Sequence, residues 1–194
     1  QLGPAVISQG YTYLAGKDII DISITHLQNL RDVTSVSCHL AVREEREVIY
    51  IYRALASQRL SVNIPIGTRL PCHSTALGRA LLTGLNDSEL SQLYYGAQLD
   101  NVESHNPQSL PALKLKVRDE REQGYSINQS DLATAIAAPI RDHHNNIIAA
   151  INISGPDAFI QGKEISIEIT HQLQQTALAI SEELGYRVRL PELI

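Results

Sequence analysis

The sequence lacks methionine and tryptophan altogether, and it has one phenylalanine and two cysteines among 194 residues. A translation product begins with methionine whereas this chain begins with Gln1, so we expect a fragment or a processed form of a longer protein. The two cysteines, Cys38 and Cys72, are too few for a disulfide framework. Reduced thiols in a cytoplasm fit this count better, because small oxidised domains use many cysteines.

Long apolar runs and an excess of basic charge are also absent. No run approaches the ~18 apolar residues that a membrane helix needs and no secretory leader is recognisable, so we expect a cytoplasmic protein without a membrane partner. The net charge of −5 disfavours a domain that grips DNA or RNA alone, because neutralising phosphates requires a basic face. A hydrophobic content of 43% and a charged content of 19% are typical of a globular domain with one sizeable core.

The spacing of the apolar residues changes along the first third of the chain. Residues 1–16 are predicted to form one helix, and Asp18 is predicted to cap a second helix that runs to about Arg31. The period then drops to two, which predicts a β-hairpin over residues 36–52 with a charged turn. A further strand is predicted near residues 60–64.

Three helices are predicted in the middle of the chain. Ser74 and Thr75 are N-cap residue types for a helix that ends near Gly84, and Asn86 is the N-cap type for the next helix. A third helix is predicted to end at Gly124, a residue suited to the left-handed C-terminal position. We interpret the outer face of this helix as solvated because of two i,i+4 ion pairs, Lys116–Glu120 and Arg118–Glu122.

The last part of the chain predicts two strands and a helix. The strands cover residues 136–141 and 147–154 and flank a polar turn, and one apolar stripe over residues 165–184 predicts the closing helix. Helix, antiparallel strands, helices, strands and helix follow one another in this order. The order indicates a single α+β domain with helices packed beside one sheet.

Three segments carry a resemblance to a known family. They read IGTRLPCHSTALGRALL (66–82), EREQGYSIN (120–128) and IAAPIRDHHNNIIAAINISGP (136–156). In this order and spacing they resemble the effector-binding domain of the IclR family of bacterial transcription regulators. The hairpin segment (35–53) and the closing ALAISEELGY (177–186) also fit, so the resemblance covers nearly the whole chain.

The resemblance implies an α+β fold that is GAF-like or profilin-like, with a curved antiparallel β-sheet flanked by helices and a small-molecule site on one face. It implies a linker helix over residues 1–16 to a missing N-terminal winged helix-turn-helix, an effector-binding domain over 17–190 and a tail over 191–194. The expected partners are a small organic or aromatic carboxylate and further copies of the chain in a homodimer or homotetramer. DNA would be bound only through the missing domain, and no cofactor or metal is implied.

The same resemblance implies an effector site. Backbone N–H groups at the helix start, with the hydroxyl of Ser74 or Thr75, would hold a carboxylate. Asn152 and Ser154 are two residues apart on a strand and would add polar contacts from one face. The candidate effector-binding residues are Leu70, Ser74, Thr75, Ala76, Leu77, Asn128, Asp131, Ala135, Asn152 and Ser154.

Two departures from the family pattern concern this site. Asn128 stands where many members have Asp, in a loop shorter than theirs in which Asp131 keeps a carboxylate nearby. Ala76 replaces a glycine that some members have, and its methyl group narrows the space over the helix start. We therefore expect an effector that differs from theirs.

The adjacent Cys72 and His73 invite other interpretations. They could contribute to a zinc site, but zinc needs two more ligands, for which His39, Cys38 or His105 are candidates. Cys72 could also be the nucleophile of a small enzyme, with His73 or His39 as its base, but no third, orienting partner is recognisable. The remaining interpretation is a buried Cys72 beside a hydrogen-bonded His73.

A bare oligomerisation domain is the last alternative. Tyr50 and Tyr52 are expected to share one face of their strand, where they would line the sheet or form a contact between copies. The sequence favours a non-enzymatic sensing domain over both alternatives.

Overall fold

A curled, six-stranded antiparallel sheet with the order β3-β2-β1-β6-β5-β4 forms the centre of the molecule. The computed structural model describes residues 4–57, 64–99, 106–130, 133–160 and 163–187. The strands are β1 (Ser37–Glu44), β2 (Glu47–Ala54), β3 (Arg69–Pro71), β4 (Ser126–Gln129), β5 (Ala133–Arg141) and β6 (Ile147–Pro156). The helices are α1 (Pro4–Thr34), α2 (Ala76–Leu82), α3 (Asp87–Leu93), α4 (Leu110–Gln123), α5 (Asp157–Ile160) and α6 (Lys163–Glu183), with a 3-10 turn η1 (Cys72–Ser74) before α2.

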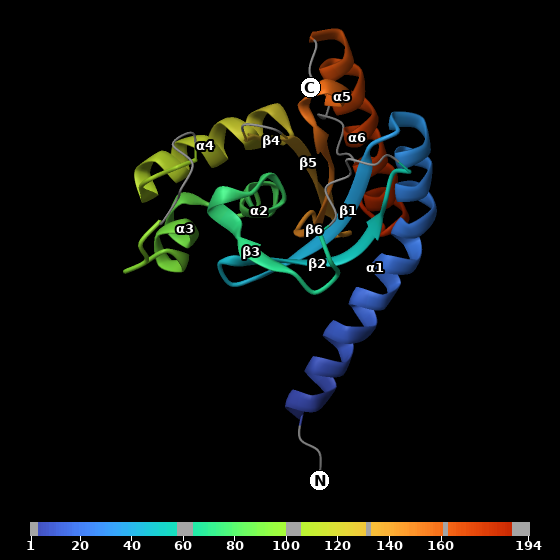
Figure 1. Ribbon diagram of the computed structural model, residues 1–194. Coiled ribbons are helices and arrows are strands. Elements are labelled where there is room, and N and C mark those ends of the chain that lie inside the picture. The colour runs from blue at the N-terminus through green and yellow to red at the C-terminus, as the bar shows by residue number, and fades with distance from the viewer. Residues whose placement is uncertain (1–3, 58–63, 100–105, 131–132, 161–162, 188–194) are drawn as a thin grey trace, which may run out of the picture.

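Helices cover both faces of the sheet (Figure 1). The long helices α1 and α6 pack against each other and against one face, while α2 packs on the other face between the strands and α4. We call these the α1/α6 face and the α2 face. The α+β class and the curved antiparallel sheet predicted from the sequence are confirmed.

Alternation along the central strands separates two hydrophobic clusters. On β5, Ile136, Ala138 and Ile140 belong to the cluster under α1 and α6. Ala137, between them in sequence, belongs with Ala150 of β6 to the cluster under α2. Successive side chains point to opposite sides of a strand, so each strand contributes to both clusters.

The first helix is longer than predicted. α1 runs without interruption from Pro4 to Thr34, so the division into two helices, with Asp18 as a cap, is wrong. Gly16 and Asp18 weaken a helix by no more than about 1 kcal/mol each, which the rest of a long helix overcomes. The expected domain boundary between residues 16 and 17 falls inside α1.

The edges of the sheet also differ from the prediction. Of the strand expected near residues 60–64, residues 58–63 lie outside the described ranges, and Ile64 is not in a strand. The edge strand is β3, which pairs with β2 through Leu70 and Val48. At the opposite edge β4 was not predicted, because a strand of four residues is too short to show a period.

A β-bulge in β2 places two tyrosines on different faces. Leu40 pairs with Tyr52 and the next residue, Ala41, pairs with Tyr50, so Ile51 is the extra residue. Tyr50 packs in the cluster under α2, whereas Tyr52 packs against the cluster under α1 and α6. The expectation that Tyr50 and Tyr52 share a face is wrong, because the bulge interrupts the two-residue alternation.

The helix ends agree with the sequence. Asn86 and Glu89 form a capping box at the start of α3. Gly124 after α4 and Gly185 after α6 have φ angles of 80° and 90°, in the left-handed region that glycine tolerates. None of the helices in the described ranges is both long and apolar enough to cross a membrane.

Candidate functional site

A strip of polar side chains lies on the α2 face of the central strands. His39 of β1 pairs with Asn152 of β6, and Ser154 lies two residues further along β6 on the same face. The positions of β5 that pair with Asn152 and Ser154 are Ala137 and Ala135. The two alanines present only methyl groups, so no large side chain from β5 covers the strip.

His39 is buried and neutral. Its Nδ1 lies 3.0 Å from Oδ1 of Asn152, and a carbonyl oxygen only accepts, so Nδ1 carries the proton. Burial lowers the pKa of His39 to about 4, although its bond to Asn152 works in the opposite direction. Nε2 is therefore an acceptor, and it has no hydrogen-bond partner among the described residues. The ring of Tyr50 meets the imidazole edge-on, with the centroids 5.5 Å apart.

The hydroxyl of Ser154 is also buried without a hydrogen-bond partner among the described residues. The residue is 5% exposed. Ser37, which pairs with Ser154 across the strands, differs because its Oγ accepts from the backbone N–H of Ala56 at 3.1 Å. A buried polar atom without a partner is rare in native proteins, so two of them on one strip point to an unmet requirement there.

The helix start opposite this strip is built by Thr75. Its Oγ1 accepts from the N–H of Gly78 and donates to the carbonyl of Pro71, both at 3.1 Å, so Thr75 is the N-cap of α2. Ser74 lies in η1 and donates to the same Pro71 carbonyl at 3.4 Å. Gly78 is required because a Cβ there would lie 2.2 Å from Cα of Cys72. The Thr75 hydroxyl already serves the helix, which leaves the backbone N–H groups of the first turn as donors.

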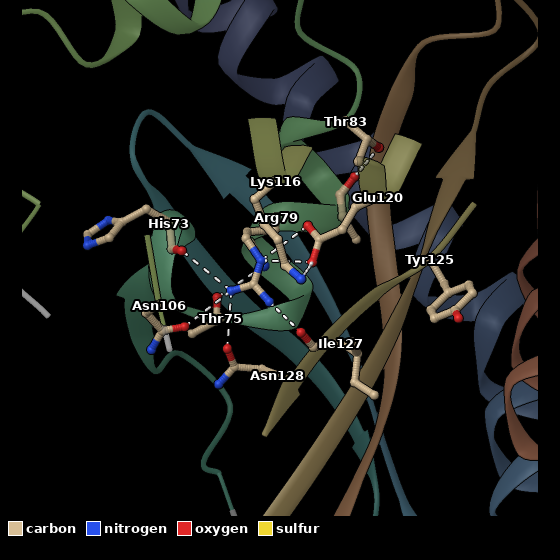
Figure 2. A network of polar contacts seen from close by, with 12 residues as sticks. His73, Thr75, Arg79, Thr83, Asn106, Lys116, Glu120, Tyr125, Ile127 and Asn128 are labelled. Carbon is tan, nitrogen blue, oxygen red and sulfur yellow. Dashed lines mark hydrogen bonds and ion pairs between the residues drawn. The ribbon is translucent and has the colours of Figure 1, made fainter. Parts of the chain in front are cut away.

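A buried arginine ties this helix to its neighbours (Figure 2). Nε of Arg79 donates to both carboxylate oxygens of Glu120, at 3.0 and 3.1 Å. Nη1 donates to Oδ1 of Asn128 at 3.1 Å, and Nη2 donates to the carbonyl of Ile127 at 2.6 Å. The Arg79 and Glu120 side chains are 2% and 0% exposed. The pair therefore joins α2, α4 and the end of β4 in a site closed to solvent.

The solvated interpretation of α4 is wrong for this position. Burial raises the pKa of the Glu120 carboxyl above its usual range, and the guanidinium of Arg79 opposes that rise. Nζ of Lys116 remains 3.9 Å from the carboxylate, at the solvent side. Arg118 pairs with Asp87 at 2.9 Å, not with Glu122. The i,i+4 spacing correctly brought Lys116 near Glu120, but it could not show which carboxylate is buried. Packing of α4 against α2 decides that.

The structure brings most of the predicted site residues to the α2 face. Ala76 and Leu77 are buried, and Leu70 and Ala135 are partly buried against the same cluster. Asn128 is engaged by Arg79, and Asp131 lies outside the described residues. Arg79 and Glu120 were missed as site residues, and His39 was considered only as a zinc ligand or a catalytic base. The alternation around Cys38 already placed His39 on the opposite face of β1 and could have indicated it.

Cys72 is poorly suited to be a nucleophile. It is fully buried, as the structural interpretation of this residue predicted, and burial raises its pKa to about 12. A thiol with this pKa is protonated at neutral pH, whereas nucleophilic catalysis uses the thiolate. His39, one of the two suggested bases, is a weak base because burial lowers its pKa to about 4. Within the described ranges no three His, Cys, Asp or Glu side chains are grouped so that they could hold a metal ion.

A curled sheet with helices on both faces carries a buried polar strip on the side where the short helix α2 packs. The chain matches the family described as "Bacterial transcriptional regulator IclR C-terminal" over residues 11–182, and it belongs to this family as a C-terminal effector-binding domain. Regulators of the IclR family bind small-molecule effectors and DNA. The resemblance predicted from the sequence is thereby confirmed.

Curated relatives are bacterial transcription regulators. XynR of Escherichia coli is 30% identical over 189 residues, which cover 96% of this chain and 75% of XynR. The transcriptional repressor AllR of Salmonella typhimurium is 28% identical and is matched over 69% of its length, again by 96% of this chain.

Solved structures share the fold over nearly the whole chain. The repressor BlcR of Agobacterium tumefaciens has a TM-score of 0.79 at 31% identity, covering 96% of this chain and 75% of BlcR. The IclR protein of Thermotoga maritima has a TM-score of 0.82 at 26% identity, covering 95% of this chain and 75% of that protein. The inducer-binding domain of PobR from Acinetobacter, at 21% identity and a TM-score of 0.74, shares the fold.

Proposed function

We propose that this domain senses a small organic acid, and that a hydroxy acid, aromatic or aliphatic, is the form that its site accepts best. In this proposal the effector lies between the start of α2 and the polar strip of His39, Asn152 and Ser154. Its binding changes the association of the domains, and with it the operator binding of an attached winged helix-turn-helix.

The observation that carries the proposal is that two buried polar atoms of the strip, Nε2 of His39 and Oγ of Ser154, have no hydrogen-bond partner among the described residues. A buried polar group left without a hydrogen bond costs roughly 1–3 kcal/mol. A ligand that supplies both partners recovers this free energy on binding. The alanines of β5 beside the strip are compatible with a ligand at this position because they present little side-chain volume.

The two atoms require different ligand groups. Nε2 of His39 is an acceptor and would repel a carboxylate, so it calls for a ligand O–H or N–H donor. The hydroxyl of Ser154 can donate to a carboxylate oxygen, and the first-turn N–H groups of α2 can add to it. A hydroxyl and a carboxylate on one small molecule satisfy both. A double mutant of the PobR inducer-binding domain, which shares this fold, was solved in complex with 3-hydroxybenzoic acid, so the fold can hold a molecule of this kind.

The coupling to the rest of the molecule would run through packed elements. Effector contacts at the start of α2 act on Arg79, which holds α4 through Glu120 and β4 through Ile127. The strip itself is on strands whose opposite face contacts α1 and α6. A ligand with different affinities for two dimer or tetramer arrangements would shift their populations.

A calorimetric and thermal-shift series of matched acids tests the proposal. Each hydroxy acid, such as 3-hydroxybenzoate or lactate, is compared with its deoxy analogue, benzoate or propionate. At about 100 times its dissociation constant a true effector adds about 2.7 kcal/mol, or roughly 5–10 °C in Tm for a domain of this size. Sedimentation with and without the best ligand then shows whether the oligomer changes. A panel without any binder would contradict the sensing proposal and favour a bare oligomerisation domain.

Matched variants locate the site. His39→Phe and Ser154→Ala are expected to weaken the hydroxy acid by about tenfold each, because each removes one hydrogen bond from a buried complex. His144→Phe and Ser88→Ala make the same changes on exposed residues and should leave binding unchanged. Equal weakening by both sets would place the acid elsewhere.

A further inference from the structure

A second polar hollow lies at the other end of α2, away from its N-cap. It has a volume of about 580 Å³ and is formed by the end of α2, the start of α3, α4 and the ends of the β1–β2 and β5–β6 hairpins. Arg43 of β1, Arg121 of α4 and Arg141 of β5 line it, and so does Glu89 of α3. We call this hollow the arginine groove.

The recorded hydrogen bonds of the three arginines go to backbone carbonyls and one amide oxygen. Nη1 of Arg43 donates to the carbonyl of Glu45 at 2.7 Å, and Nη1 of Arg141 donates to the carbonyl and Oδ1 of Asn145, both at 3.2 Å. Arg121 donates from Nε to the carbonyl of Thr83 at 2.7 Å and from Nη2 to the carbonyl of Leu85 at 2.5 Å. No carboxylate of a described residue forms an ion pair with any of the three.

The one carboxylate in the lining is already engaged. Oε2 of Glu89 accepts from the backbone N–H of Asn86 at 2.7 Å, as part of the capping box of α3. The hollow is therefore lined by three guanidinium groups and one carboxylate, and the carboxylate of Glu89 is hydrogen-bonded to the start of α3. This excess of positive charge is confined to the groove, since the whole chain has a net charge of −5.

Other arginines of the described chain show that partners were available. Arg31, Arg69, Arg79 and Arg118 each form an ion pair with a carboxylate. Arg46 and Arg187 donate to backbone carbonyls instead. The groove brings together three more arginines, from three separate elements, that form no ion pair with a carboxylate of the described residues. Bringing like charges together in a half-open hollow is unfavourable, and an anion held between them removes that cost.

We infer that the arginine groove binds a small polyanion, a phosphate ester or a polycarboxylate, at a site separate from the effector site. Guanidinium groups recognise both anions through charge-assisted hydrogen bonds. The amide side chains of Asn86, Asn145 and Asn146 line the same hollow and can donate to further ligand oxygens. Its volume lies within the range of sites for small metabolites, roughly 300–1,000 Å³.

Arg121 also gives the groove a connection to α2. Its two carbonyl acceptors, of Thr83 and Leu85, follow the last turn of that helix. A polyanion that binds Arg121 would act on the same seven-residue helix as the proposed effector, from its other end.

Titration calorimetry of the protein with pyrophosphate and, separately, with citrate tests the site at constant ionic strength set by KCl. The double variant Arg43→Gln/Arg141→Gln is expected to lose at least about a hundredfold in affinity, about tenfold for each charged contact removed. Binding of pyrophosphate alone would identify a phosphate site, and binding of both anions a general polyanion site. Failure of both to bind the wild type would overturn the inference.

Two controls separate this site from general charge and from the effector site. Arg118→Gln removes an exposed arginine from α4 outside the groove and should leave anion binding unchanged; an equal loss would mean non-specific attraction and overturn the site. His39→Phe should also leave anion binding unchanged. The test of the groove is therefore independent of the effector proposal. If the double variant does not fold, Arg43→Gln alone replaces it, with an expected loss of about tenfold.

Discussion

The two faces of the central sheet are built from the same strands but bury side chains of different chemical character. Under α1 and α6, Ile136, Ile140, Ile151 and Leu173 are fully buried among apolar neighbours. Under α2 the strands contribute alanines, and the polar groups of the strip and the Arg79–Glu120 pair are buried with them. The first face is mainly an apolar core, although Ser23 of α1 and Ser181 of α6 are buried there, whereas the second combines a buried ion pair, buried polar groups without partners among the described residues, and small side chains.

This difference shows how one sheet combines stability with a binding role. Apolar burial stabilises by roughly 25 cal/mol per Å² without needing specific partners. Buried polar groups stabilise only when every donor and acceptor is matched, so they make a face sensitive to what binds it. Four variants test this contrast.

The largest effect is expected for Glu120→Ala on the α2 face. It leaves the guanidinium of Arg79 buried without its carboxylate, which costs about 3–5 kcal/mol of unfolding free energy. The double variant Arg79→Met/Glu120→Leu should recover most of that loss, because it removes both charges. Urea unfolding of the three proteins measures the differences. A single variant as stable as the wild type would show that the pair is not what holds α2 to α4.

A core substitution on the opposite face should cost less and change only stability. Leu173→Ala removes a fully buried side chain from α6 and is expected to lower the unfolding free energy by about 3 kcal/mol. Its dissociation constant for a hydroxy acid should stay that of the wild type at a temperature where both are folded. Lost ligand binding in the folded variant would mean that the two faces are not separable.

Acid should weaken the α2 face through His39. The pKa of His39 is about 4 in the folded protein against 6.5 for the free side chain, so the unfolded chain binds the proton first as pH falls. Stability due to this group is complete above about pH 6.5 and is lost between there and pH 4, by about 2.5 kcal/mol from pH 7.5 to pH 4.5.

Urea unfolding at both pH values, in the wild type and in His39→Phe, isolates this effect. Between pH 7.5 and pH 4.5 the unfolding free energy of the variant should fall by about 2.5 kcal/mol less than that of the wild type. Parallel pH dependences of the two proteins would mean that His39 is not held neutral by its surroundings.

The smallest effect has the opposite sign. Ser154→Ala removes a buried hydroxyl without a partner in the described part of the chain, so the unliganded protein should gain up to about 1 kcal/mol. Thermal unfolding without ligand measures the gain, and Ser37→Ala, which removes a hydrogen-bonded hydroxyl, should instead lose stability. Destabilisation by both would show that Ser154 has a partner in the free protein.

Local chemistry made part of the fold and site predictable. The N-cap Asn86, the glycine after α4 and the hairpin around the charged turn depend on neighbouring residues, and all were predicted from the sequence. Asn152 and Ser154 were also placed on one face by their spacing, and the structure confirms it. The bulge at Ile51 could not be read in this way, because it reflects how two strands pair.

The sequence by itself determined the family, the α+β class, the ends of most helices and the apolar stripe of each strand, since these depend on residues close together in the chain. Only the tertiary structure decided that Glu120 meets Arg79, 41 residues away, and that His39 meets Asn152, 113 residues away. Burial and hydrogen-bond pairing arise from contacts between distant segments, and they set the charge and polarity of both proposed sites.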